Sequence, residues 1–289
     1  MWQAYETPAS IDETLALLAR YDGRARLIAG GTDLIIELQE GTHDVECLVD
    51  VSRIPGLDRI EQHGDWIQLG PNVTFRQIKE SALLHDWARV LAEAAATVGA
   101  LQIQTMATLA GNVANAMPAA DGSVALVALD AEAEIADCHG RQWRPVTGLF
   151  AGPGKSAIDP ARQMIAGFRF RALGRGQGSA WERIGRRRAL VLPILNCGVS
   201  LALDGERLAW ARIGLGPVEP VPFRARQAEA FLAGRQAGEE TYAQAAEVAA
   251  SECHPRSSVL RASKEYRIDV LKVMVRQGLA RAAAQAGGT

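Results

Sequence analysis

Residues 27–38 read LIAGGTDLIIEL, an apolar strand pattern that breaks at Gly30 and Gly31 and resumes with helical spacing. Glycine lets the backbone turn sharply and expose its N–H groups, and a helix start adds free amides and the positive end of the helix dipole. Thr32 or Asp33 can cap that helix. The stretch therefore predicts a phosphate site, although most Gly-Gly turns between a strand and a helix are only turns.

A second stretch of small residues, 108–121, reads TLAGNVANAMPAAD and carries almost no bulk for a core. Such a lean segment favours close approach of the backbone to a ligand, which Gly111 permits. Neutral donors to a phosphate follow at three positions: Thr108, Asn112 and Asn115. Asp121 could accept from a ribose or from a ring N–H. A tight turn, in which the two asparagines hold the backbone, is an equally good account of this loop alone.

Together the two stretches carry a resemblance to a known family. AGGTD at 29–33 and TLAGN at 108–112 resemble the paired diphosphate motifs of the FAD-binding subunits of molybdenum hydroxylases, the xanthine dehydrogenase and carbon monoxide dehydrogenase family. The resemblance runs the whole length, and GPGK at 152–155 and PRSSVLRASKEYR at 255–267 are most similar to bacterial xanthine dehydrogenases with separate subunits. This chain has Ala110 where the family usually has a second glycine, so the backbone there must keep φ negative or tolerate mild strain.

The resemblance implies a set of FAD contacts in and around both motifs. They are Leu27, Ile28, Ala29, Gly30, Gly31, Thr32, Asp33, Leu34, Val98, Thr108, Ala110, Gly111, Asn112, Asn115, Asp121, Met164, and Arg186 or Arg187. The five histidines lie outside both glycine motifs, so we expect FAD to be held noncovalently. The cluster Arg183, Arg186, Arg187 and Arg188 could approach FAD, dock an acidic partner or form a solvated face. GPGK could cover the cofactor or be a plain surface turn.

The resemblance also implies an α+β fold in two domains. Residues 1–173 would form an FAD-binding domain of the vanillyl-alcohol-oxidase/molybdopterin-dehydrogenase type, with two α/β subdomains at about 1–54 and 55–173. Residues 179–286 would form a C-terminal α+β domain of the CO dehydrogenase flavoprotein type, with a small antiparallel sheet and helices. Three glycines recur in the polar segment between the domains: Gly174, Gly176 and Gly178.

Residue patterns predict the main elements of both domains. Ser10 and Glu13 have the spacing of a capping box, at the start of an apolar stripe that ends near Tyr21. Asp204-Gly205 is a hairpin signal. Predicted helices cover 10–21, 74–80, 83–98, 123–129, 224–232, 239–251 and 262–286, and predicted strands cover 2–5, 47–51, 66–69, 132–138, 180–184, 195–203 and 208–215.

Composition excludes several classes of protein. The 289 residues are 48% hydrophobic, enough for a substantial core. With 31 basic against 33 acidic residues, the chain lacks the positive charge of a nucleic-acid-binding protein. No signal-peptide pattern and no run of about 20 apolar residues is present, so we expect a soluble, cytoplasmic protein without a membrane span. The four cysteines have no paired spacing, which disfavours a metal site; any iron–sulfur centres would lie on another chain.

The leading functional hypothesis is an electron-transfer flavoprotein subunit. The resemblance implies that electrons from a molybdopterin-binding large subunit pass through two [2Fe–2S] clusters of a small subunit to FAD on this chain, and then to NAD⁺ or another acceptor. Two alternatives remain: a stand-alone FAD-dependent oxidase or reductase of the same fold, and a scaffold subunit whose flavin site has decayed, for which Ala110 is the hint. No nucleophile–base pair is evident, so no catalytic residue is assigned.

Overall fold

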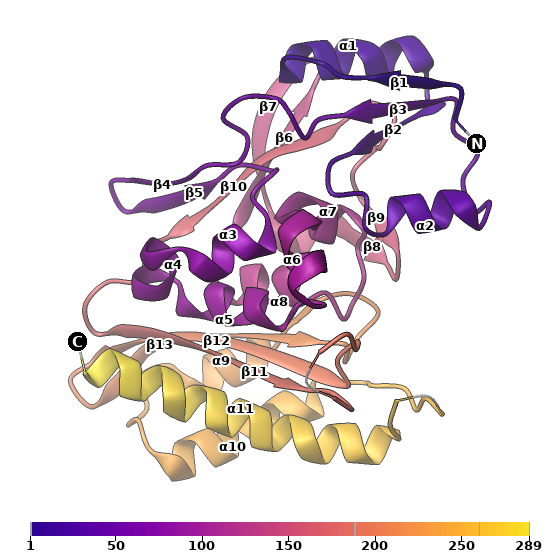
Figure 1. Cartoon of the computed structure of the whole chain (residues 1–289). Helices are drawn as coiled ribbons and strands as arrows, with labels where there is room; N and C mark the ends of the chain where they lie inside the picture. Colours follow the sequence, from indigo (N-terminus) through magenta and orange to yellow (C-terminus); the bar gives the residue numbers. More distant parts are fainter. Residues whose placement is uncertain (1, 188, 260, 289) are drawn as a thin grey trace.

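The computed structural model describes residues 2–187, 189–259 and 261–288, and Arg188 of the predicted arginine cluster lies outside them. The chain is an α+β protein stacked in three tiers, with both ends of the chain on the outer tiers (Figure 1). The upper tier holds the first 50 residues, the middle tier an antiparallel sheet with six helices, and the lower tier a second antiparallel sheet with three helices.

The upper tier is a small parallel sheet. Its strands β1 (Ala4–Glu6), β3 (Cys47–Asp50) and β2 (Ala25–Ile28) lie in that order, joined by helices α1 (Ile11–Tyr21) and α2 (Leu34–Gln39). The Ser10 hydroxyl accepts from the Glu13 amide at 3.1 Å, but the Glu13 carboxylate accepts from Ala9 N at 2.7 Å rather than from Ser10 N. The predicted capping box is therefore half formed. Strand β2 ends at the Gly30-Gly31 turn.

The middle tier is a five-stranded antiparallel sheet in the order β4-β5-β10-β6-β7. The strands are β4 (Ile60–His63), β5 (Trp66–Leu69), β10 (Met164–Arg171), β6 (Glu132–Asp137) and β7 (Gly140–Pro145). Its inner face packs on six helices around a fully buried core that includes Phe75, Phe168 and Phe170. These helices are α3 (Phe75–Glu80), α4 (Ala82–Trp87), α5 (Arg89–Thr97), α6 (Leu101–Met106), α7 (Leu109–Ala114) and α8 (Asp121–Ala128).

The predicted helix 83–98 is wrong as a single element, because it is interrupted at Ala88. Ala88 has φ −159° and ψ 47°, outside the helical region, and separates α4 from α5. The Trp87 carbonyl accepts a hydrogen bond from Leu173 N at 2.9 Å, on the segment that leaves β10. An apolar repeat continues across the break, so the sequence pattern could not reveal a contact made by a residue 86 positions away.

The lower tier is a four-stranded antiparallel sheet in the order β11-β12-β13-β14. Its strands are β11 (Gln177–Ile184), β12 (Leu195–Asp204), β13 (Arg207–Gly216) and β14 (Phe223–Arg224), and the predicted hairpin at Asp204-Gly205 is confirmed. The helices α9 (Arg226–Leu232), α10 (Glu239–Ser251) and α11 (Lys264–Gly287) complete the tier, and α11 lies along the sheet's outer face (Figure 1).

Helices α5 and α8 pack on the opposite face of that sheet, so the middle and lower tiers share a tight interface. A Cβ added to Gly198 would lie 2.9 Å from the Ala128 Cβ, and one added to Gly214 would lie 2.7 Å from the Val124 carbonyl oxygen. Glycine at these strand positions allows the close approach of α8. Residues 195–202 are all buried, as expected for a strand covered on both faces. Within the described residues, no helix is long and apolar enough to cross a membrane.

Candidate cofactor-binding site

The two glycine-bearing stretches converge. A Cβ added to Gly30 would lie 2.0 Å from the Met106 carbonyl oxygen and 3.0 Å from the Ala107 Cα, so the first turn touches the backbone that leads into the second stretch. Gly31 has φ +65°, which favours glycine. Burial raises the pKa of Asp33, and the side chain of Asn115, which lies near the Asp33 carboxylate, acts in the opposite direction. Figure 1 shows the turn between β2 and α2 beside α7, with α2 at the right edge of the molecule.

A run of free backbone amides lies in the first turn. Among the described residues, no acceptor takes a hydrogen bond from the N–H groups of residues 30–34, whereas Ile35 N donates to Gly31 O at 3.1 Å. Asp33 occupies the N-cap position of α2, but its side chain makes no capping bond and meets Asn115 instead. The predicted side-chain cap is therefore wrong, and these amides remain available to an anionic ligand.

The second stretch is helical at its start, where a loop was predicted. The Thr108 hydroxyl caps α7 by accepting from Gly111 N at 3.1 Å. Ala110 lies inside this helix and is not among the described non-glycine residues with positive φ, so the missing glycine costs no backbone strain. The Asn112 side-chain oxygen accepts from Ser123 N at 3.0 Å, which leaves its NH₂ group free of described partners.

Asp121 lies in a buried polar cluster between the middle and lower tiers. Its carboxylate accepts from Arg183 Nε at 3.3 Å on both oxygens and from Asn196 Nδ2 at 2.7 Å. Burial raises the pKa of Asp121 to about 6, since it outweighs the opposing effects of Arg183 and Asn196. In this structure both carboxylate oxygens are engaged by protein donors, so the predicted contact to a ribose or ring N–H remains a prediction.

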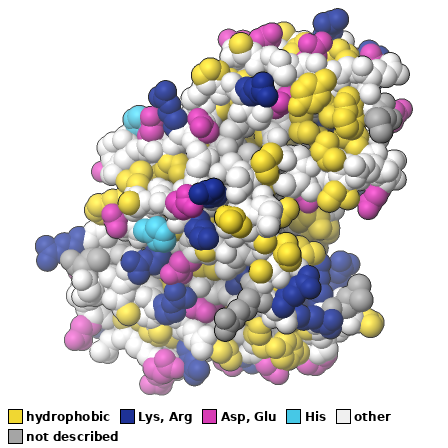
Figure 2. Space-filling model, in the orientation of Figure 1, with side chains coloured by type: hydrophobic (Ala, Val, Ile, Leu, Met, Phe, Trp, Pro, Cys, Tyr) yellow, Lys and Arg dark blue, Asp and Glu magenta, His cyan; other side chains and the backbone are white. Residues whose placement is uncertain are grey.

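The loop that carries Arg186 and Arg187 is hydrogen-bonded to the chain just after α5. Leu190 N donates to Gly99 O at 3.0 Å, and Arg183 Nη2 donates to Val191 O at 2.5 Å, which brings this loop next to half-buried Val98. Arg187 Nε donates to Leu190 O at 3.1 Å. Arg186 and Arg187 are both exposed, and Lys and Arg side chains gather at the right of the lower tier in Figure 2.

Several of the implied residues are buried or half-buried and offer less surface to a ligand. Met164 is the first residue of β10, is 3% exposed and packs with Ile11 and Ala166. Ile28 is buried and packs with Val45, and Leu27, its neighbour in β2, is half-buried. Ala29 and Leu34 are half-buried at the two ends of the free-amide run.

The GPGK segment is a hairpin that contacts the second stretch. Strands β8 (Phe150–Gly152) and β9 (Lys155–Ser156) pair around Gly154, whose N–H donates to Ala116 O at 3.1 Å. Ala116 itself has φ +51°. The sequence does not predict the contact of Gly154 with Ala116 or that of Gly30 with the Met106 carbonyl. Both contacts are made by backbone atoms, and no side-chain pattern marks them.

Two pockets, of about 240 and 150 Å³, contain none of the predicted contact residues. The four cysteines are free, and within the described residues no group of three or more His, Cys, Asp or Glu side chains could hold a metal ion.

Two family models match the chain. Residues 2–170 match the FAD binding domain in molybdopterin dehydrogenase, and residues 181–282 match the CO dehydrogenase flavoprotein C-terminal domain.

Known proteins are similar over nearly the full length. The xanthine dehydrogenase FAD-binding subunit of Escherichia coli O157:H7 is 29% identical over 287 residues, which cover 99% of this chain and 97% of that protein. The carbon monoxide dehydrogenase medium chain of Hydrogenophaga pseudoflava is 27% identical over 275 residues, 95% of each chain.

Solved structures also match this chain over nearly its full length. A carbon monoxide dehydrogenase chain from Hydrogenophaga pseudoflava superposes with a TM-score of 0.93 at 28% identity, covering 99% of this chain and 98% of that one. Quinoline 2-oxidoreductase from Pseudomonas putida 86 gives 0.90 at 27% identity, with 98% and 97% covered. The chain therefore belongs to the molybdopterin dehydrogenase family of oxidoreductases, as a subunit with the family's FAD-binding domain and its CO dehydrogenase flavoprotein C-terminal domain.

Proposed function

We propose that this chain holds FAD noncovalently between residues 29–34 and 108–115 and passes electrons within a molybdenum hydroxylase complex. The observation that carries the proposal is the contact of Gly30 with the Met106 carbonyl, together with the free amides that follow it. A diphosphate needs several N–H donors and space for close approach, and a turn that contains two glycines supplies both.

The chain's own residues would divide the work of binding. The amides of residues 30–34 would donate to the diphosphate, and the Thr108 hydroxyl and the Asn112 NH₂ group would add neutral donors from α7. Arg186 and Arg187 would contribute positive charge from the loop beside Val98. Bound FAD would supply one- and two-electron redox chemistry.

The partners are proposed from the relatives' names. Relatives are described as the medium chain of carbon monoxide dehydrogenase and as a subunit of a dehydrogenase complex. We propose a small [2Fe–2S] subunit as the electron donor to this chain, a large molybdopterin-binding subunit as the site of substrate oxidation, and NAD⁺ as the final acceptor. A cytoplasmic location, where NAD⁺ is present, belongs to the same proposal.

Anaerobic reduction of the complete complex tests this route. The complex, purified from its host, is reduced with its hydroxylation substrate, and the visible flavin absorbance is followed before and after NAD⁺ is added. The proposal predicts bleaching that requires the iron–sulfur subunit and recovery on addition of NAD⁺. Recovery only with a different acceptor would refute the NAD⁺ assignment, and substrate turnover by the isolated chain would favour a stand-alone oxidase or reductase.

A further inference from the structure

The guanidinium of Arg267 is buried, and only one of its nitrogen atoms has a hydrogen-bond partner among the described residues. It lies in the first turn of α11, which begins after Ser263, and is 3% exposed. Its Nη1 donates to the Pro217 carbonyl at 3.2 Å, but its buried Nε has no hydrogen-bond partner among the described residues. An unpaired buried donor on a charged group is costly, so it calls for a partner that the protein chain itself does not provide.

The other strongly buried arginines of the described chain have carboxylate partners. Arg183 pairs with Asp121, and Arg224 pairs with Glu229 and Asp130. Arg267 takes part in no ion pair among the described residues. The one acidic residue in its helical turn, Glu265, is exposed and interacts with Ser263 and Lys264 instead.

Two further arginines lie close enough to act on Arg267. Burial first, and then the charges of Arg261 and Arg256, lower the pKa of Arg267, and no acidic residue opposes them. A turn fixes this segment: Ser258 N donates to Ala262 O at 2.9 Å, and Lys264 N donates to the Ser257 hydroxyl at 2.9 Å. Neither Arg256 nor Arg261 has an ion-pair partner among the described residues. Three positive charges therefore gather at the start of a 24-residue helix, whose dipole adds to their field.

We propose that Arg267, Arg256 and Arg261 form a binding site for one phosphate-type oxyanion at the N-terminus of α11. The Nε and Nη2 atoms present one edge of the Arg267 guanidinium, and such an edge donates two parallel hydrogen bonds to an oxyanion. Three guanidinium groups match a dianion better than a single carboxylate. The phosphate can be a free ion or a group on a nucleotide, and the two sources share this chemistry.

Calorimetric titration of the full-length, FAD-saturated chain tests the site, because saturation removes competition from the cofactor. Inorganic phosphate and AMP are titrated separately at constant ionic strength. Saturable phosphate binding supports the site, and AMP that binds about tenfold more tightly than phosphate assigns the group to a nucleotide. Equal affinities assign it to a free ion. No saturable binding of either probe overturns the proposal and leaves ordered water as the partner of Arg267 Nε.

Variants locate the binding. Arg267→Gln and the double variant Arg256→Gln/Arg261→Gln are each expected to raise the phosphate Kd about tenfold or more. The double variant changes only exposed or half-buried side chains, so it keeps the test open if Arg267→Gln does not fold. Arg276→Gln, on the same helix, is the matched control and should bind normally. An unchanged Kd in the double variant contradicts the proposal, and Gly30→Ala separates it from the flavin site because that variant should retain the phosphate response.

Discussion

Because Gly30 has no Cβ, the first turn can approach the backbone that leads into the second stretch at the proposed ligand site. A Cβ there would lie 2.0 Å from the Met106 carbonyl oxygen, far inside van der Waals contact, and that oxygen belongs to the backbone. The conflict cannot be relieved by rotating a side chain, so an added methyl must separate the two stretches.

Gly30→Ala is therefore expected to lower stability by about 1–3 kcal/mol and to weaken FAD binding by roughly tenfold or more. Chemical denaturation and FAD titration measure the two effects. Gly148→Ala is the matched control, since a Cβ at Gly148 meets nothing within 4 Å and its φ is not positive. Normal FAD affinity in Gly30→Ala would show that the two stretches need not touch for binding.

Asp121 provides a pH test of the buried cluster beside the site. Its folded pKa of about 6 lies above the value of about 4 expected in the unfolded chain. The folded state therefore binds this proton more tightly, and the resulting stability is present below pH 4 and is lost as pH rises to 6.

Compared with Asp121→Asn, the wild-type chain should lose up to about 1.4 kcal/mol of relative stability per pH unit between pH 4 and 6, with no further change above pH 7. Urea unfolding of both proteins across this range gives the difference. The opposite slope would mean that Arg183 outweighs burial and holds the carboxylate ionised.

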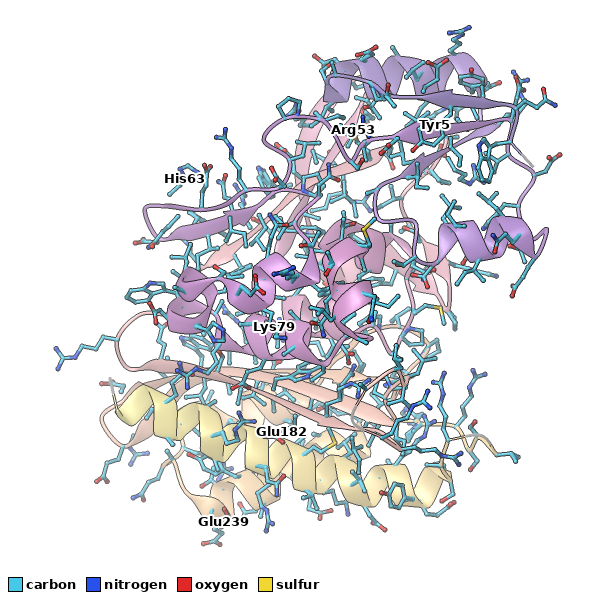
Figure 3. All side chains as sticks on the ribbon, viewed as in Figure 1. Tyr5, Arg53, His63, Lys79, Glu182 and Glu239 are labelled. Atoms are coloured by element: carbon cyan, nitrogen blue, oxygen red, sulfur yellow. The ribbon has the colours of Figure 1, made fainter. Side chains whose placement is uncertain are left out.

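At the scale of elements, Arg281 on α11 joins three segments. Its guanidinium donates to both Glu93 carboxylate oxygens on α5 at 2.9 and 3.0 Å, and to Glu182 and the Trp181 carbonyl on β11 at 2.7 and 2.8 Å. Figure 3 shows Glu182 at the boundary between the lower sheet and α11. The Trp181 amide also donates to Glu93, at 3.1 Å. This network fixes α11 against the middle tier.

Arg281→Ala should cost about 1 kcal/mol, with a smaller loss in high salt because the arginine is half exposed. Arg276→Ala on the same helix removes only the exposed pair with Glu239, and its effect should be close to zero. Equal losses in the two variants, measured by denaturation at low and high salt, would argue against a special role for the network.

The sequence predicted elements well where local signals were strong and poorly where distant contacts decide. The helix after Ser10 and the hairpin at Asp204-Gly205 follow from a cap and a turn, and both are present. The strands β4 and β7 were missed because their residues are mostly exposed and polar. Helix α7 lies where the sequence predicts a loop, because Gly111 and Asn112 lower helix propensity while the Thr108 cap stabilises the short helix.

At the site, too, the sequence predicts local backbone features but not contacts between distant side chains. The two glycine motifs pointed to converging backbones, and Gly30 does contact Met106. Side-chain partners could not be read from the sequence: Asn115 meets Asp33, and Asp121 meets Arg183 from 62 residues away. The domain limits 1–173 and 179–286 and the individual FAD contacts stay predictions.

At the scale of the whole molecule, Asp130 links the middle and lower tiers. It follows α8 and accepts from Arg224 Nη1 at 2.6 Å, while Arg212 lies 3.6 Å away. Burial acts to raise the pKa of Asp130, but Arg224 and Arg212 together hold it below the usual value. Its stabilising effect is therefore present at neutral pH and is lost only in acid, as pH falls through this lowered pKa.

Asp130→Asn removes the charge and keeps a side chain that suits the φ of +55° at this position, where Ala would add backbone strain. Arg224 keeps Glu229 as a partner and Asp130 is half exposed, so the cost should be about 1 kcal/mol at pH 7. The difference from wild type should shrink in acid, below about pH 4. Asp65→Asn, which weakens an exposed pair with Arg171, is the matched control and should leave stability almost unchanged. A cost for Asp130→Asn no greater than that of the control would show that this ion pair does not stabilise the contact between the tiers.

The most direct test of the central claim compares the affinities of the purified chain for FAD and for riboflavin, which has no phosphate. If the backbone amides of residues 30–34 hold the diphosphate, FAD should bind noncovalently at one molecule per chain, and riboflavin should bind roughly a hundredfold more weakly, a difference of about 3 kcal/mol. Equal affinity for the two flavins, or no binding of FAD, would contradict the account.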